Sequence, residues 1–172
     1  MLSGDLMQQI PTMSQEQYQR EQYRRNSQYT ELWDLLDEVK DPEIPVLSLW
    51  DMGVLRDVQR EGDQVKVTIT PTYSGCPAMD VMREDIEICL RDSGVKSYRV
   101  ESQLSPAWTS DWMTDKGRAQ LRNYGIAAPD DAVGSVGRDT PEANVRCPHC
   151  RSVQTRRISE FSSTACKALF QC

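Results

Sequence analysis

The sequence predicts an α+β fold in which a small three-stranded sheet is covered by helices and followed by a small cysteine-rich appendage. Three observations predict it. Apolar residues recur at helical spacing in residues 30–39 and 79–90, whereas three other segments alternate apolar and polar residues as strands do. A Cys-x-x-Cys pair, Cys147 and Cys150, follows a stretch rich in Ala, Asp, Gly and Pro near the C-terminus.

Local signals justify each element in chain order. Thr30 can cap the first helix, which must stop before Pro42 because the residue before proline avoids the helical region. Gly94 is a typical left-handed end for the second helix. A third strand is needed because an isolated hairpin is only marginally stable. The predicted elements are a helix over 30–39, hairpin strands over 54–58 and 65–69, a helix from Pro77 to Gly94, a strand over 98–104 and a short helix over 115–124.

Composition divides the chain into four regions. Residues 1–28 are rich in glutamine and lack apolar periodicity, so we expect a disordered tail, with a short helix from Gln15 to Arg25 as the alternative. Residues 29–126 form the predicted α+β domain, and residues 127–143 form a linker. Residues 144–172 form the cysteine-rich appendage.

The charge of the chain argues against nucleic acid and membranes as partners. The chain has 20 basic and 26 acidic residues and a net charge of −6, so it has no electrostatic reason to bind an anionic polymer. No apolar run approaches the ~20 residues that cross a bilayer. We expect a cytoplasmic protein whose six cysteines are reduced.

The turn before the second helix ends in a thiol, Cys76. Because proline favours the first helical position, Pro77 would leave Cys76 at the helix cap, where free N–H groups and the helix dipole stabilise a thiolate. We therefore expect a lowered pKa and a reactive or metal-holding Cys76; the alternative is a buried residue that fills a turn. Asp41 and Glu43 lie in a proline-stiffened loop, either as metal-holding carboxylates or as an acidic end to the first helix.

The appendage has the cysteine spacing of a zinc site. A Cys-x-x-Cys turn presents two thiolates to a tetrahedral ion, and a second pair usually follows after ~15–20 residues. Cys147 and Cys150 are the first pair; either Cys166 and Cys172 both complete it, or a second turn begins at Cys172. His149 points away if its neighbours bind. We expect a structural zinc ion on which this segment depends to fold.

Two tryptophans stand in a segment without periodicity, residues 106–114. Trp108 and Trp112 either cap the core or contact a partner. A catalytic role for Cys76 lacks a base, because the single histidine, His149, is in the tail. We therefore expect a protein that is not itself catalytic.

Five short motifs carry a resemblance to a known family. They are Asp-Pro-Glu-Ile-Pro (41–45), Asp-Met-Gly (51–53), Thr-Pro-Thr-Tyr-Ser-Gly-Cys-Pro (70–77), Pro-Ala-Trp-Thr (106–109) and Ser-Ser-Thr-Ala-Cys-Lys-Ala (162–168). Over residues 29–172 the chain resembles PaaD, the D subunit family of phenylacetyl-CoA epoxidase. Its Asp-Pro-Glu and Gly-Cys-Pro motifs are shared with the SufT-like family of iron–sulfur assembly factors. The resemblance implies a SufT-like domain over 29–126 and a zinc-ribbon-like segment over 144–172. PaaD-like tails continue beyond the position of Cys172, so we expect the ribbon to be incomplete.

The resemblance also implies an accessory role. Cys76 matches the reactive cysteine of the assembly family, and Asp41 and Glu43 match its acidic loop. We expect a maturation subunit in aerobic phenylacetate degradation that helps insert iron or an iron–sulfur cluster into the oxygenase or reductase subunits of the epoxidase. The alternative is a structural adaptor that docks epoxidase subunits through the ribbon, Trp108 and Trp112.

Overall fold

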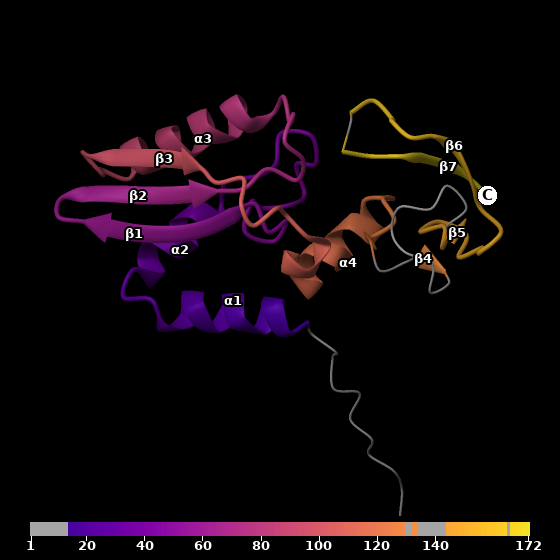
Figure 1. The fold of residues 1–172 in the computed structure, drawn as a ribbon, viewed down its shortest axis with the longest axis horizontal. Helices are drawn as coiled ribbons and strands as arrows, with labels where there is room; N and C mark the ends of the chain where they lie inside the picture. The colour runs from indigo at the N-terminus through magenta and orange to yellow at the C-terminus, as the bar shows by residue number, and fades with distance from the viewer. Residues whose placement is uncertain (1–13, 130–131, 134–143, 165) are drawn as a thin grey trace, which may run out of the picture.

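The computed structural model describes residues 14–129, 132–133, 144–164 and 166–172. Within these residues four α-helices accompany a three-stranded sheet, and pairs of short strands form a C-terminal ribbon beside α4 (Figure 1). The predicted α+β fold is confirmed. In this described part of the chain, no helix combines the length and the apolar character needed to cross a bilayer.

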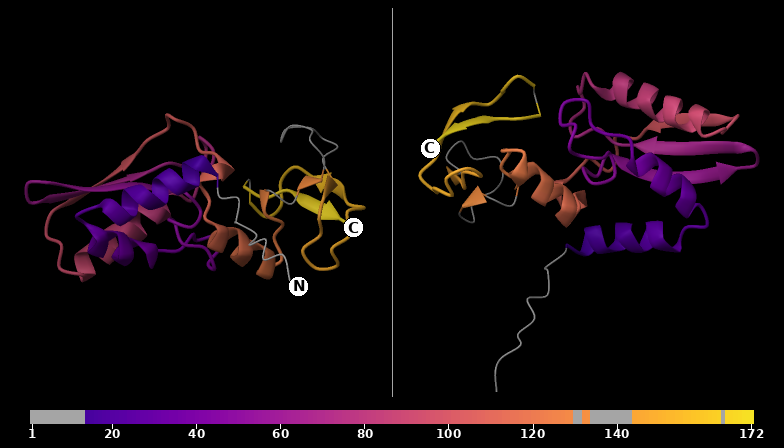
Figure 2. Two further views of the ribbon diagram at one scale, coloured as in Figure 1. Left: turned by 90° about the horizontal axis from the view of Figure 1, so that it is seen from below. Right: turned by 180° about the vertical axis from the view of Figure 1, so that it is seen from behind.

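The three strands of the sheet follow the predicted pattern. β1 (Leu55–Glu61) pairs antiparallel with β2 (Gln64–Ile69), and β3 (Tyr98–Ser102) pairs parallel with β2 on its other side. Parallel strands need a crossover, which α3 (Met79–Asp92) supplies. α2 (Thr30–Asp37) and α3 cover the same face of the sheet (Figure 2).

The core lies between this sheet face and the two helices. Trp33 of α2 is fully buried, and its ring meets Trp50 edge-on with 5.3 Å between ring centroids. Burial of such apolar surface is the main favourable contribution to folding. The large, fully buried aliphatic side chains around it include Leu36, Leu47, Leu49, Leu55, Ile69, Ile86 and Leu90.

The N-terminal region contains a docked helix, α1 (Gln15–Asn26). The Ser14 side chain accepts the Gln17 N–H at 3.1 Å and begins the helix. Arg20 then lies over the Trp50 ring at 4.2 Å and donates to the backbone carbonyls of Trp50, Leu55 and residue 112. The expectation of a disordered tail is therefore wrong for residues 14–28, because α1 docks through an arginine instead of an apolar stripe, and the structure shows the alternative, a short helix over these residues.

Trp112 is a core residue and not a free contact for a partner. It lies in a 3-10 turn (Ser110–Trp112), is 5% exposed and has the Arg56 guanidinium 3.3 Å from its ring centroid. Its Nε1–H donates to Glu16 of α1 at 2.7 Å. The predicted partner role of Trp112 is therefore wrong, since this ring caps the core. Trp108 is half-buried and donates to the Met52 carbonyl at 3.1 Å.

The C-terminal ribbon packs near the end of α4 (Asp115–Asn123). β4 (Ala132–Val133) pairs with β5 (Asn144–Val145), and β6 (Arg156–Ser159) pairs with β7 (Leu169–Gln171). A Cβ added at Gly125, just after α4, would lie 2.9 Å from the His149 ring. Most of the predicted linker falls outside the described residues.

Candidate functional site

Cys76 lies in the turn between β2 and α3, before the cap of the helix. α3 begins at Met79 and its N-cap residue is Ala78, so the prediction that Pro77 opens the helix is wrong. Cys76 is half-buried and packs against the core. Its backbone N–H donates to the Tyr73 carbonyl at 3.3 Å, so a tight turn presents the sulfur.

The pKa of the Cys76 thiol is raised above its ordinary value, which contradicts the predicted lowering. Burial is the largest cause, and the nearby Asp41 and Cys166 groups add to it. Backbone N–H groups of Ala78 and Met79 do donate to the sulfur and favour the thiolate, but burial outweighs them. At neutral pH Cys76 is therefore a protonated thiol.

This raised pKa predicts slow alkylation of Cys76 near neutral pH. Only the thiolate reacts, so the rate with iodoacetamide should keep rising as the pH passes the ordinary thiol pKa of about 8.5. Asp41→Asn keeps the side-chain oxygen that orders the loop and removes a charge that raises the Cys76 pKa. We expect this variant to react faster at any pH from about 7 to 9. Peptide mass spectrometry of alkylated Cys76 measures it, and equal rates in the two proteins would contradict the electrostatic link.

Asp41 organises the loop that follows α2. Its side chain is 4% exposed, and its Oδ1 accepts the N–H groups of Glu43 and Ile44, both at 2.8 Å. Burial raises the pKa of Asp41 despite these hydrogen bonds. The Glu43 side chain is exposed, and its charge acts on Tyr73. The loop therefore brings Asp41 close to Cys76 and leaves Glu43 toward solvent.

Three of the four predicted zinc ligands meet in the ribbon. The sulfur atoms of Cys147, Cys150 and Cys172 lie within 4.8 Å of one another. Backbone N–H groups of Cys150 and His149 donate to the Cys147 sulfur and lower its pKa to about 7. Thiols at this spacing, one of them readily ionised, fit a tetrahedral metal ion with thiolate ligands. The three thiols can therefore hold a metal ion.

Cys166 does not belong to this cluster, so of the two predicted alternatives, the one in which Cys166 and Cys172 together complete the site is not what the structure shows. It lies in the loop that joins β6 to β7, whereas Cys172 follows β7 at the opposite end of the hairpin. Figure 1 shows that this loop faces the α+β domain while the C-terminus lies on the far side. An extended strand between the two cysteines separates them at ~3.3 Å per residue.

The hairpin loop meets the α+β domain at a cavity of about 320 Å³. Lys167 Nζ reaches across and donates to the Glu43 carbonyl at 3.5 Å. Trp108 lines the cavity floor beside apolar side chains of α4 and its following residues. Sequence reasoning missed Lys167 and Tyr73, although each lies in one of the family motifs, 162–168 and 70–77. The residues that line the cavity from the two sides include Thr72, Tyr73, Trp108, Cys166 and Lys167.

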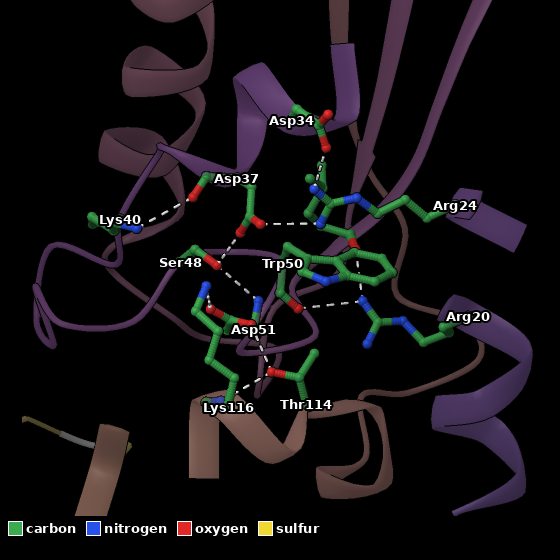
Figure 3. A network of polar contacts seen from close by, with 12 residues as sticks. Arg20, Arg24, Asp34, Asp37, Lys40, Ser48, Trp50, Asp51, Thr114 and Lys116 are labelled. Atoms are coloured by element: carbon green, nitrogen blue, oxygen red, sulfur yellow. Dashed lines mark hydrogen bonds and ion pairs between the residues drawn. The ribbon is translucent and has the colours of Figure 1, made fainter. Parts of the chain in front are cut away.

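A second hollow, about 450 Å³, lies among α1, α2 and α4 and is lined by paired charges (Figure 3). Lys116 Nζ lies 2.9 Å from one oxygen of Asp51, and Thr114 donates to the other at 2.6 Å. Arg24 of α1 pairs with Asp37 of α2 at 3.1 Å. These pairs hold the helices in register with the core, so we assign this hollow a structural role.

Comparisons with known proteins agree with this two-part architecture. Residues 30–101 match a family model described as "Iron-sulfur cluster assembly protein", and residues 131–172 match "PaaD zinc beta ribbon domain". An Escherichia coli K12 protein, named as the D subunit of a "Putative 1,2-phenylacetyl-CoA epoxidase", is 48% identical over 145 residues, covering 84% of this chain and 86% of that protein. An "Fe-S protein maturation auxiliary factor" of Porphyromonas gingivalis is 35% identical over 89 residues, 51% of this chain and 84% of that protein. A Bacillus anthracis domain of unknown function aligns with TM-score 0.49 and 23% identity over 60% of this chain and 95% of that structure.

The fold and the cysteine cluster define an α+β domain of the iron–sulfur cluster assembly type joined to a metal-binding β-ribbon. The similarity to the E. coli relative extends over most of both chains. The chain belongs to the PaaD family, the family of the D subunit of phenylacetyl-CoA epoxidase.

Proposed function

We propose that this protein is an accessory maturation factor, which helps load iron or an iron–sulfur cluster into the oxygenase or reductase subunits of phenylacetyl-CoA epoxidase in aerobic phenylacetate degradation. The observation that carries the proposal is the position of Cys76. Its half-buried thiol lies in a turn beside Asp41, within the segment that matches the assembly model. Relatives named as Fe-S maturation factors support the same role.

The chemistry of the Cys76 turn suits a carrier that releases its cargo. Iron must displace the thiol proton, and a raised pKa makes that proton a stronger competitor, so binding stays weak enough for transfer. Asp41 and Glu43 supply carboxylate oxygens from the neighbouring loop, and mixed sulfur and oxygen ligands suit iron. The proton that leaves Cys76 goes to solvent.

We infer that the ribbon metal is zinc and that its role is structural. Cys147, Cys150 and Cys172 would hold it, since three sulfur atoms within 4.8 Å fit a thiolate-bound ion. Bound there, the ion would join the Cys-x-x-Cys turn to the end of β7. The β6–β7 hairpin leaves the large apolar side chains Ile158, Phe161 and Leu169 exposed, so such a link would hold its strands together.

Cys76→Ser tests the proposed loading role. When the variant is produced together with the other epoxidase subunits, we expect their iron content and their epoxidase turnover to fall at least about tenfold, since even outer partners of a metal site contribute about 10–100-fold. Iron analysis and product formation measure this. Cys89→Ser is the matched control, because Cys89 is an equally half-buried thiol on α3. A wild-type iron content in the epoxidase subunits produced with Cys76→Ser would contradict the proposal.

One observation favours the adaptor alternative. The β6–β7 hairpin leaves Ile158, Phe161 and Leu169 exposed at 54%, 61% and 47%, an apolar surface of the kind that docks partner proteins. Normal epoxidase activity with Cys76→Ser, together with lost activity in a Phe161→Ser chain, would support an adaptor over a carrier.

A further inference from the structure

We propose that Cys166 is the second thiol of the cargo site, so that the site is shared between the α+β domain and the ribbon. The inference rests on the proposed function. It adds a ligand, Cys166, that the cysteine spacing had assigned to the zinc site instead. Its ligand class is a soft cation: ferrous iron or a small iron–sulfur cluster held by two thiolates, with oxygen ligands from the acidic loop.

The hairpin loop is built to present Cys166 away from the ribbon metal cluster. The Ser162 N–H donates to the Lys167 carbonyl at 2.7 Å, and the Lys167 N–H donates to the Thr164 carbonyl at 3.4 Å, which closes a tight loop. The Thr164 hydroxyl lies 3.2 Å from the Cys166 sulfur. Cys166 is exposed, so its sulfur is free to reach an incoming ion.

Two independent contacts seat this loop against the Cys76 side of the domain. Lys167 Nζ reaches the Glu43 carbonyl in the acidic loop at 3.5 Å. Cys166 and Lys167 also line the same cavity as Tyr73, the residue whose carbonyl closes the Cys76 turn. The ribbon thereby delivers Cys166 to the same loops that hold Cys76 and the acidic pair.

Electrostatic coupling supports this placement. Cys166 is among the groups that raise the pKa of Cys76, and both thiols raise the pKa of Tyr73. Asp41 also acts on Cys76, while Lys167 partly offsets the charge of Asp41. These directions agree with the placement given by the Lys167 hydrogen bond and the shared cavity.

The proposed ligand atoms stand apart in this structure. In the part of the chain that the structure describes, Cys76, Cys166 and Asp41 do not form a group with ligand atoms within 4.8 Å of one another. A cation held by both thiols would require the two sulfur atoms to approach each other, and each thiol would release its proton to solvent on binding. Two protein thiolates leave positions free on the cargo for a recipient protein to occupy.

Metal counting on full-length single variants tests the assignment. Wild type, Cys76→Ser, Cys166→Ser, Cys150→Ser and the control Cys89→Ser are purified anaerobically and treated with ferrous iron and sulfide. We expect Cys166→Ser to keep wild-type zinc and to lose the sulfur-to-iron charge-transfer absorption, as Cys76→Ser does. Cys150→Ser should lose zinc, and Cys89→Ser should match wild type in both readouts.

The other outcomes separate this inference from the proposed function. If Cys76→Ser loses iron and Cys166→Ser binds it normally, the shared site is wrong and the carrier role stands. If both variants bind iron as wild type does, both proposals fall. Loss of zinc from Cys166→Ser would show that Cys166 is a ligand of the ribbon metal and would overturn the inference.

A measurement on the wild-type chain avoids any dependence on variant folding. A short bis-maleimide should join Cys76 to Cys166 within one chain, and prior loading with iron and sulfide should block that link. Peptide mass spectrometry identifies the joined pair. Cross-links confined to Cys147, Cys150 and Cys172 would contradict the proximity of the two thiols.

Discussion

Removal of the ribbon metal should unfold residues 144–172 and leave the α+β domain folded. β6 and β7 have only four and three residues, and the hairpin exposes Phe161, so this segment buries little apolar surface. Structural zinc contributes about 10–16 kcal/mol to the folding of comparably small metal-bound peptides. We expect amide hydrogen exchange in β6 and β7 to rise to the rate of an unfolded peptide after treatment with a chelator.

The α+β domain provides the internal control for this experiment. Exchange in β2 and α3 should stay unchanged, because their core contacts do not involve the ribbon. Cys147→Ser should reproduce the chelator effect without added reagent, whereas Cys89→Ser should not. Retained protection across residues 156–171 in metal-free protein would mean that the ribbon folds by packing alone.

Trp33→Ala should lower the free energy of unfolding of the α+β domain by about 3–5 kcal/mol. Trp33 is fully buried on α2, and its ring touches two others, Trp50 at 5.3 Å and Tyr23 of α1 at 6.3 Å between centroids. The change would leave a cavity between α1, α2 and the sheet. Urea unfolding followed by circular dichroism measures the loss.

Leu104→Ala is the matched control for Trp33→Ala. Leu104 is 60% exposed, so its truncation should change the unfolding free energy by no more than about 0.5 kcal/mol. A Trp33→Ala chain as stable as wild type would show that the core can collapse around the missing ring.

The sheet and its covering helices were predictable because their signals are local. Alternation in residues 54–58, 65–69 and 98–104 and the apolar stripe of α3 each depend on a few consecutive residues, and each segment folds as its pattern indicates. α1 was different. Its Arg20 and Tyr23 contact residues more than 25 positions away in the sequence, Trp50 and Asp57. Helical periodicity cannot predict such contacts.

The candidate site was only partly predictable for the same reason. The identity of Cys76 and the Cys147–Cys150 pair could be read from short motifs. The direction in which the pKa of Cys76 is shifted could not be predicted, because burial and Asp41, which is distant in the sequence, outweigh the helix N–H groups that sequence reasoning relied on. Spacing also assigned Cys166 to the nearest similar residue along the chain, whereas the hairpin turns it toward residues about 90 positions earlier.

The seating of α1 has a practical consequence for anyone who shortens this protein. A fragment that begins at residue 29, the boundary that composition indicates, would lack Arg20, whose guanidinium covers the Trp50 indole. The three backbone carbonyls that accept hydrogen bonds from Arg20 would then be exposed to water. Its Trp112 would lose the Glu16 hydrogen bond. Proteins that bind such a fragment could do so through the newly exposed Trp50 and Trp112 rings, which are covered in the intact chain. Truncated versions should therefore begin no later than Ser14.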